Sequence, residues 1–158
     1  MKEDQKSKSK SKTVKPIPEG MHTVTPFLVV NQGAMLLEFI KKAFNGKVTA
    51  QLDGEDGKVM HATIKIGDST IMVSDASERI GPVQSMLHVY VDDVDKVYNQ
   101  ALNAKGQSIR EPQDEFYGDR SAGILDPWEN QWWIATHVED VTDDEIRRRA
   151  EKFQKQEA

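Results

Sequence analysis

The first half of the chain alternates between two hydrophobic periods. Residues 22–30, HTVTPFLVV, are rich in β-branched side chains and predict a strand. Residues 33–46, GAMLLEFIKKAFNG, have apolar side chains at helical spacing and predict a helix that ends at Gly46. The apolar stripe of this helix comprises Met35, Leu36, Phe39, Ile40, Ala43 and Phe44. Three more strands are predicted at 47–52, 58–66 and 69–75, and Gly67-Asp68 between the last two is typical of a hairpin turn.

The same order of elements returns in the second half. Residues 86–91 predict a strand, and 92–106 predict a helix with acidic residues in its first turn and Gly106 at its end. The apolar stripe of this helix comprises Val94, Val97, Tyr98, Ala101 and Leu102. Further strands are predicted at 107–112, 119–125 and 130–137, the last two joined by the turn DPWE. The similar pacing of the two halves predicts an α+β fold built from two βαβββ modules, at about 22–80 and 84–138.

The two ends of the chain differ from these modules. Residues 142–156 predict a helix that begins with a capping box from Thr142 to Glu145. Its apolar stripe is narrow, so we expect it to pack on the surface of a domain that spans 21–141. Residues 1–20 carry six lysines and three acidic residues and are rich in serine, which predicts a disordered basic tail. A solubilising arm explains such a tail better than a nucleic-acid contact, because the rest of the chain is acidic.

Composition narrows the classes of function. The formal net charge of the whole chain is −5, which argues against a nucleic-acid-binding domain. No apolar stretch approaches the roughly 20 residues of a membrane span, and the start of the chain lacks the core of a signal peptide. We therefore expect a cytoplasmic protein that has neither a membrane nor a nucleic acid as partner. The chain has no cysteine, which excludes disulfides, thiolate metal sites and a cysteine nucleophile.

Several quoted segments together resemble a known superfamily. They are TPFLVV with EFIKKAF, DGKVMHATIKIGDSTIMVSD, LHVYVDDVD, FYGDR, and the Asp-Pro that precedes WIATHVEDV. This set resembles the vicinal oxygen chelate superfamily, which includes glyoxalase I, bleomycin-resistance proteins and extradiol dioxygenases, and within it the PhnB-like branch. The resemblance implies a curved mixed sheet around a cup, helices on the outside, and a homodimer that completes the cup.

Strand alternation predicts which side chains face that cup. In residues 86–91 the apolar side chains at 87, 89 and 91 share one face, so Met86, His88 and Tyr90 take the other. In 59–66 the same argument sends Met60, Ala62, Ile64 and Ile66 toward the helices and His61, Thr63 and Lys65 toward the cup. In QWWIATH it buries Trp132 and turns Trp133 and His137 toward the cup.

The resemblance also locates the metal positions of the superfamily on this sequence. They fall at Thr25, Met72, Met86 and Trp133, none of which is His, Asp or Glu. Thioethers, a hydroxyl and an indole are poor ligands for the divalent ions of these enzymes. We therefore expect neither a metal nor another cofactor, and the glyoxalase and dioxygenase mechanisms, which need the ion as a Lewis acid, are disfavoured. The alternative is a relocated site in which His61, His88 and His137 bind a metal or one of them acts as general base.

The segment FYGDR, residues 116–120, allows two interpretations. Arg120 could hold a ligand anion in bidentate fashion while Tyr117 offers an aromatic face and a hydroxyl. Alternatively, Asp119 and Arg120 pair with each other across the loop, and Gly118 adopts a special backbone angle.

The sequence thus favours a binding protein over an enzyme. Aromatic and methionine side chains around a cup suit a small, partly aromatic organic ligand. The alternative is an enzyme of the superfamily, a lyase, isomerase or dioxygenase-like protein that uses the three histidines. The predicted ligand-binding residues are Thr25, Phe27, His61, Met72, Met86, His88, Tyr90, Tyr117, Arg120, Trp133 and His137.

Overall fold

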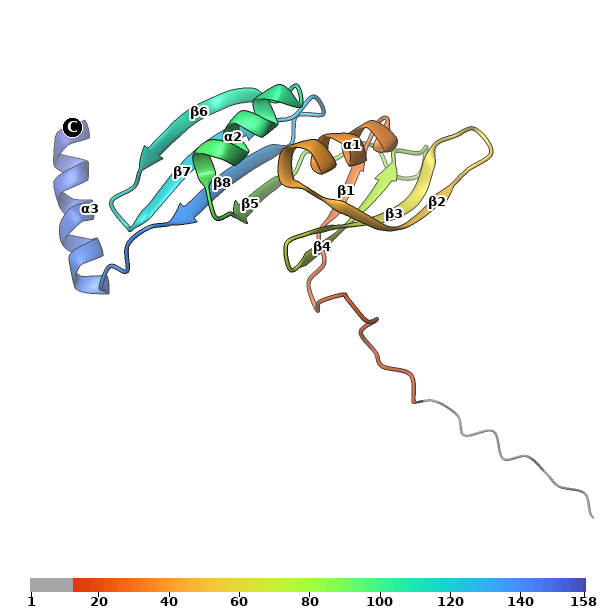
Figure 1. The fold of residues 1–158 in the computed structure, drawn as a ribbon, viewed down its shortest axis with the longest axis horizontal. Helices are drawn as coiled ribbons and strands as arrows, with labels where there is room; N and C mark the ends of the chain where they lie inside the picture. Colours follow the sequence, from red (N-terminus) through yellow and green to blue (C-terminus); the bar gives the residue numbers. More distant parts are fainter. Residues whose placement is uncertain (1–12) are drawn as a thin grey trace, which may run out of the picture.

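The computed structural model describes residues 13–158, and the first module forms a four-stranded sheet with one helix (Figure 1). Its strand order is β1-β4-β3-β2, in which β1 runs parallel to β4 and the remaining pairs are antiparallel. The elements are β1 (Phe27–Val30), α1 (Gly33–Phe44), β2 (Lys47–Asp53), β3 (Val59–Ile66) and β4 (Ser69–Asp75).

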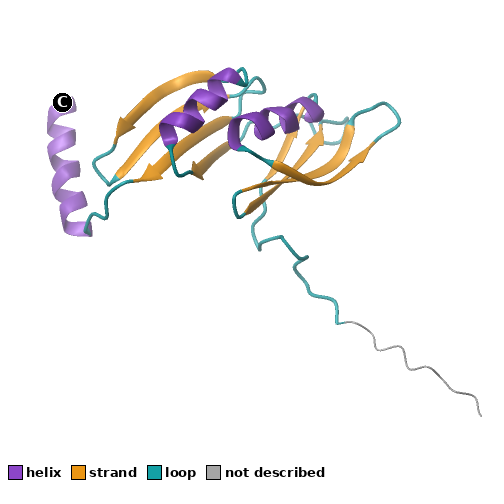
Figure 2. Ribbon diagram, viewed as in Figure 1, coloured by secondary structure: helices purple, strands orange, loops and turns teal. Residues whose placement is uncertain are grey.

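The second module repeats this topology, with strand order β5-β8-β7-β6 and β5 parallel to β8. Figure 2 shows α1 and α2 on the same side of the two sheets. No helix of residues 13–158 covers the opposite side, which we call the open face. The predicted α+β fold of two βαβββ modules with a further C-terminal helix is therefore confirmed. The elements are β5 (Met86–Tyr90), α2 (Val94–Asn103), β6 (Gln107–Asp114), β7 (Asp119–Leu125), β8 (Gln131–His137) and α3 (Asp143–Glu157).

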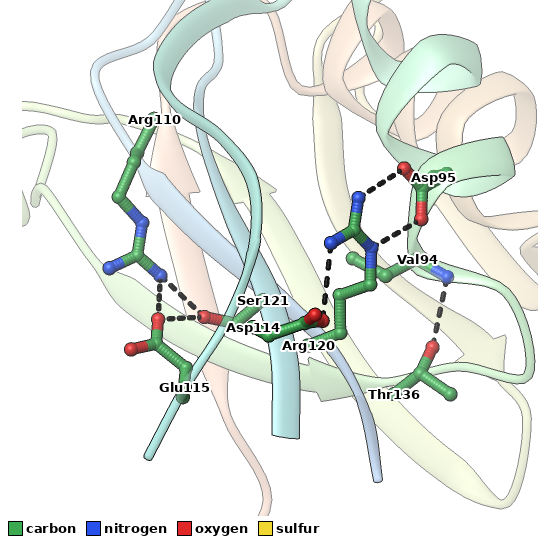
Figure 3. Close-up of polar contacts among 8 residues, drawn as sticks. All are labelled: Val94, Asp95, Arg110, Asp114, Glu115, Arg120, Ser121 and Thr136. Carbon is green, nitrogen blue, oxygen red and sulfur yellow. Dashed lines mark hydrogen bonds and ion pairs between the residues drawn. The ribbon is translucent and has the colours of Figure 1, made fainter. Parts of the chain in front are cut away.

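The start of each helix is hydrogen-bonded to the last strand of its own module. A side chain at the end of the last strand of each module accepts a hydrogen bond from the start of that module's helix. In the first module Asp75 Oδ1 accepts from the amide of Gln32 at 2.8 Å. In the second, Thr136 Oγ1 accepts from the amide of Val94 at 2.9 Å (Figure 3). Each contact satisfies an amide that the helix itself cannot pair.

One hydrophobic core joins the two modules, and Trp132 lies at its centre. Its side chain is fully buried, and its ring lies 4.7 Å from the ring of Phe44 and 6.3 Å from that of Phe39, both on α1 of the other module. The side-chain amide of Gln100 on α2 also donates to the carbonyl of Ala43 on α1. Burial of these aromatic surfaces fixes one module against the other. The predicted core position of Trp132 is confirmed.

The buried carboxylate of Asp126 organises the turn that precedes β8. It accepts hydrogen bonds from the amides of Trp128 and Asn130, from the Asn130 side chain, and from the indole nitrogen of Trp132 at 2.9 Å. Asn130 is itself fully buried, and its side-chain oxygen accepts from the amide of Ser85 at the start of the second module. The turn DPWE is therefore more than a connection, because its first residue positions the core tryptophan.

Two details of the sequence prediction are wrong in β1 and α1. The first strand begins at Phe27 rather than at residue 22. Pro26 has no backbone N–H group to pair with a neighbouring strand. Just before it, the Thr25 hydroxyl donates to the carbonyl of His22 at 3.0 Å and closes a local turn. Met35 is 53% exposed, and Leu37 takes its place against the sheet.

Met60 does not face the helices, because it is 62% exposed while Val59 is buried. The register of β3 against β2 is irregular here, with Leu52 opposite His61 but Asp53 opposite Val59. Such an irregularity shifts the alternation of side chains by one residue. The alternation resumes with Ala62 and Ile64, both fully buried as predicted.

The C-terminal helix α3 lies beyond the end of the second sheet and has no buried residue (Figure 1). Thr142 caps it by accepting from the amide of Glu145, as predicted. Arg149 attaches the helix by ion pairs to Glu139 and a hydrogen bond to the carbonyl of Phe116. No helix in the described range 13–158 is long and apolar enough to span a membrane.

Of the predicted disordered tail, residues 1–12 lie outside the described residues. Residues 13–20 are exposed and form neither helix nor strand. The carbonyl of Gly20 accepts from the hydroxyl of Thr70 on β4 at 2.8 Å, which is a contact with the first module. The predicted domain boundary near residue 20 stays a prediction.

We expect Asp126→Ala to lower the free energy of unfolding by about 3–5 kcal/mol, because it leaves several buried donors without an acceptor. Chemical denaturation monitored by tryptophan fluorescence measures this change. Asp144→Ala, at a 94% exposed side chain, is the control and should change stability by less than about 0.5 kcal/mol. Equal stability of the two variants would contradict a central role for Asp126.

Candidate functional site

The open face carries predicted ligand residues in one row across each sheet. In the first sheet Phe27 lies opposite Met72, and Met72 lies opposite Thr63. Strand pairs at the same register place their side chains side by side on the same face. The row in the second sheet runs from β5 through β8 and β7 to β6 and consists of His88, Trp133, Gly123 and Arg110.

A groove of about 540 Å³ lies where the two modules meet, between β1 and β5. Phe27, Met86 and His88 line it, and Phe27 and Met86 are 47% and 68% exposed. The ring of His61 meets the ring of Phe27 edge to face at 5.8 Å. Four of the predicted ligand residues, from both modules, are therefore gathered around one groove. Its other lining residues are Pro26, Leu28, Ser85 and Leu87.

Trp133 faces the open side, but its ring is not free. A side chain at Gly123 would place its Cβ 3.0 Å from two ring atoms of Trp133, so glycine leaves the space that the ring occupies. The guanidinium of Arg110 lies over the ring, 5.1 Å from its centroid. The indole nitrogen donates to the Gln131 side chain at 3.2 Å. Trp133 therefore acts as a half-buried part of the open face, and Arg110 covers it.

Arg110 is itself held by a polar cluster that sequence analysis missed. Its Nη2 donates to Glu115 and to the hydroxyl of Ser121 (Figure 3). The Ser121 hydroxyl donates in turn to Glu115 at 2.7 Å. The register of β6 against β7 shifts on both sides of Arg110, so simple alternation along β6 gives no reliable signal for its direction.

A second polar cluster lies farther along the same face and centres on the buried carboxylate of Asp119. The Tyr90 hydroxyl donates to Asp119 at 3.0 Å, which raises the pKa of the phenol. His137 Nδ1 contacts the other oxygen of Asp119 at 2.8 Å, and His137 Nε2 contacts Asp140 at 2.8 Å. Hydrogen bonds to these two carboxylates raise the pKa of His137. Period-2 alternation in DRSAGIL, where Ile124 is core, could have placed Asp119 on this face.

Arg120 does not lie where either interpretation of FYGDR placed it. Its guanidinium binds both oxygens of Asp95 on α2, at 2.8 and 3.0 Å, and also contacts Asp114 at 3.2 Å (Figure 3). It lies beside α2 because alternation along β7 sends Arg120 and Asp119 to opposite faces. Asp119 pairs with His137 and Tyr90 instead. Gly118 does adopt the special backbone angle, with φ +101°, and a Cβ there would lie 2.2 Å from the carbonyl of Glu139.

Tyr117 is 38% exposed and packs edge to face against Phe116 at 5.4 Å. Its pKa is raised, first by burial of the phenol and then by the negative charge of Glu115. Phe116 also contacts Phe153 of α3, with ring centroids 5.6 Å apart. Tyr117 therefore lies beside the Arg110 cluster, at the outer end of the second sheet.

The residues at the implied metal positions do not fit a divalent ion. Thr25 lies before β1, where its hydroxyl donates to a backbone carbonyl. The ring of Trp133 packs against Gly123 and is covered by Arg110. Within residues 13–158, no three His, Asp or Glu side chains lie close enough to hold a metal. His61, His88 and His137 in particular are not gathered into such a group. Our expectation that the protein uses no cofactor stays a prediction.

We expect the pKa of His137 to lie above 6.5 and to fall in the variant Asp119→Asn, which removes the main charged partner. A raised folded-state pKa stabilises the fold below the unfolded pKa, and this stabilisation is lost as the pH rises through the raised value. NMR titration of the imidazole measures the pKa of His137 in the wild type and in Asp119→Asn. Urea unfolding of the wild type and of His137→Gln at about pH 6 and about pH 9 measures the stabilisation. The wild type should exceed His137→Gln in free energy of unfolding by more at the lower pH. His22→Gln, at an exposed loop residue, is the control.

Comparison with known proteins agrees with this architecture. Residues 20–134 match the Glyoxalase/Bleomycin resistance protein/Dioxygenase superfamily. An uncharacterised protein of Mycobacterium bovis, Mb0911c, is 31% identical over 135 residues, which cover 78% of this chain and 89% of that protein. TioX from Micromonospora sp. ML1 has a similar fold, with a TM-score of 0.61, 19% identity, and coverage of 73% of this chain and 99% of TioX. A PhnB protein from Bacillus cereus gives a TM-score of 0.57 at 15% identity, with coverage of 73% and 99%. The chain therefore belongs to the Glyoxalase/Bleomycin resistance protein/Dioxygenase superfamily.

Proposed function

We propose that this protein binds a small, flat, partly aromatic organic molecule on its open face, at the groove between β1 and β5. The observation that carries the proposal is the gathering of exposed apolar side chains there. Phe27, Met86 and Tyr90 are 47%, 68% and 65% exposed on one face, and the first two line the same groove. Exposed apolar patches of this kind mark binding surfaces more often than inert ones.

The chemistry of the groove supports binding rather than metal-assisted catalysis. Phe27 and the imidazole of His88 offer aromatic faces, and Met86 offers an adaptable thioether. The enzyme alternative finds less support, since both ring nitrogens of His137 contact carboxylates and its partner histidines lie elsewhere on the face. The family description covers both resistance proteins and enzymes, so it favours neither alternative.

The test is a titration with 3-methylindole, a small flat probe, followed by protein NMR. We expect shifts at the groove residues, and we expect Phe27→Ala to weaken binding by roughly two- to tenfold, the worth of one aromatic contact. Phe153→Ala is the matched control, because Phe153 on α3 has nearly the same exposure, 44%. Shifts confined to the separate 700 Å³ groove at Trp128 would contradict the proposal, as would equal losses in the two variants.

We further propose that a second copy of the chain covers the open face and completes the site. Exposed Phe27, Met86 and Tyr90 suit such an interface, and β1 and β5 are each the outer strand of their sheet.

Light scattering coupled to gel filtration should then give twice the chain mass of 17.8 kDa. A charge at the interface should separate the copies, so Met86→Glu should shift the mass toward the monomer. Met35→Glu changes an equally apolar, 53% exposed side chain on α1 and should leave the dimer intact. A monomeric wild-type protein at about 100 μM would contradict the dimer.

A further inference from the structure

The Arg110 guanidinium has one nitrogen on the open face, Nη1, that donates no hydrogen bond within the described residues. Its Nη2 is engaged by Glu115 and Ser121, and its Nε is buried without an acceptor. Nη1 has no partner among residues 13–158 either. Since Nε is the single buried, unpaired side-chain nitrogen or oxygen in this range, Nη1 retains accessible surface. The guanidinium therefore presents an accessible, unpaired N–H group.

The position of Arg110 connects this donor with the proposed binding groove. Arg110 ends the row that begins with His88, a residue of the groove wall, and Trp133 lies between them. Its guanidinium lies over the Trp133 ring, 5.1 Å from the centroid, on the open face. Trp133 pairs with His88 across β5 and β8, so a guanidinium over the Trp133 ring lies next to the strand that carries the groove wall.

The surrounding charges indicate what kind of acceptor suits this donor. Glu115 already compensates the charge of Arg110, and its side chain is only 12% exposed. Because this ion pair carries no net charge, it attracts a further anion only weakly. A carbonyl oxygen accepts from the free N–H group without adding charge.

We propose that Arg110 is a specificity-determining residue of the open face and selects flat, uncharged ligands that carry a carbonyl oxygen at one edge. This inference rests on the proposed binding function and deepens it.

Three indoles of nearly equal size test the inference. Indole-3-carboxamide offers an uncharged carbonyl, indole-3-carboxylate an anion, and 3-methylindole no acceptor. In protein NMR titrations of the full chain, we expect the carboxamide to bind about tenfold more tightly than 3-methylindole, through one hydrogen bond to a charged donor. The carboxylate should bind no more tightly than the carboxamide.

Two variants assign this preference to Arg110 and its partner. The double variant Arg110→Met with Glu115→Gln removes the donor, keeps an apolar stem over Trp133 and leaves no unpaired buried charge. It should bind the carboxamide and 3-methylindole equally. Glu115→Gln alone frees the charge of Arg110, so it should improve carboxylate binding about tenfold relative to the carboxamide. A merely structural role for Arg110 would change stability without changing these ratios.

The outcomes separate this inference from the proposed function. If 3-methylindole shifts the groove residues but the carboxamide preference is absent, or persists in the double variant, the role of Arg110 is overturned and groove binding stands. If none of the three indoles shifts the open face at millimolar concentration, both are overturned. A carboxylate that binds wild type more tightly than the carboxamide overturns the selection of uncharged ligands.

Discussion

The rest of the structure depends on the burial of Trp132 with its indole N–H satisfied by Asp126. The tryptophan is completely buried, and its ring contacts Phe39 and Phe44 on the helix of the other module. Burial of an indole is favourable only when its polar nitrogen has a partner, and Asp126 supplies one at 2.9 Å. The same carboxylate pairs with the turn before β8, so one group orients both the turn and the core ring.

This interaction also fixes what the open face can present. Neighbouring residues on a strand point to opposite sides, so anchoring Trp132 in the core leaves Trp133 no other side than the open one. There Gly123 leaves room for the ring, and the Arg110 guanidinium lies over it. The first module has Met72 and Thr63 in the corresponding row. The two halves therefore share a backbone plan and differ in the surface that they offer.

Polar residues on β7 show how one strand serves both faces. Arg120 binds Asp95 and attaches α2 to the second sheet, whereas its neighbour Asp119 receives Tyr90 and His137 on the open side. The sequence FYGDR suggested one polar constellation, and the fold divides it into two. The helix-side pair is structural, and the open-side carboxylate lies beside the proposed binding surface.

The sequence by itself determined the two βαβββ modules, because hydrophobic periods of two and of 3.6 residues depend only on local backbone geometry. It also determined that Trp132 is core while Trp133, His88 and Met86 are not, since alternation follows directly along an unbroken strand. Only the tertiary structure decided the rest of the open face. The irregular register of β3 exposes Met60. Because the register of β6 is also irregular, alternation along the sequence could not predict the face on which Arg110 lies. The partners of Arg110 and Arg120 could not be derived either, because a long charged side chain takes whichever carboxylate the packing of distant strands and helices brings within reach.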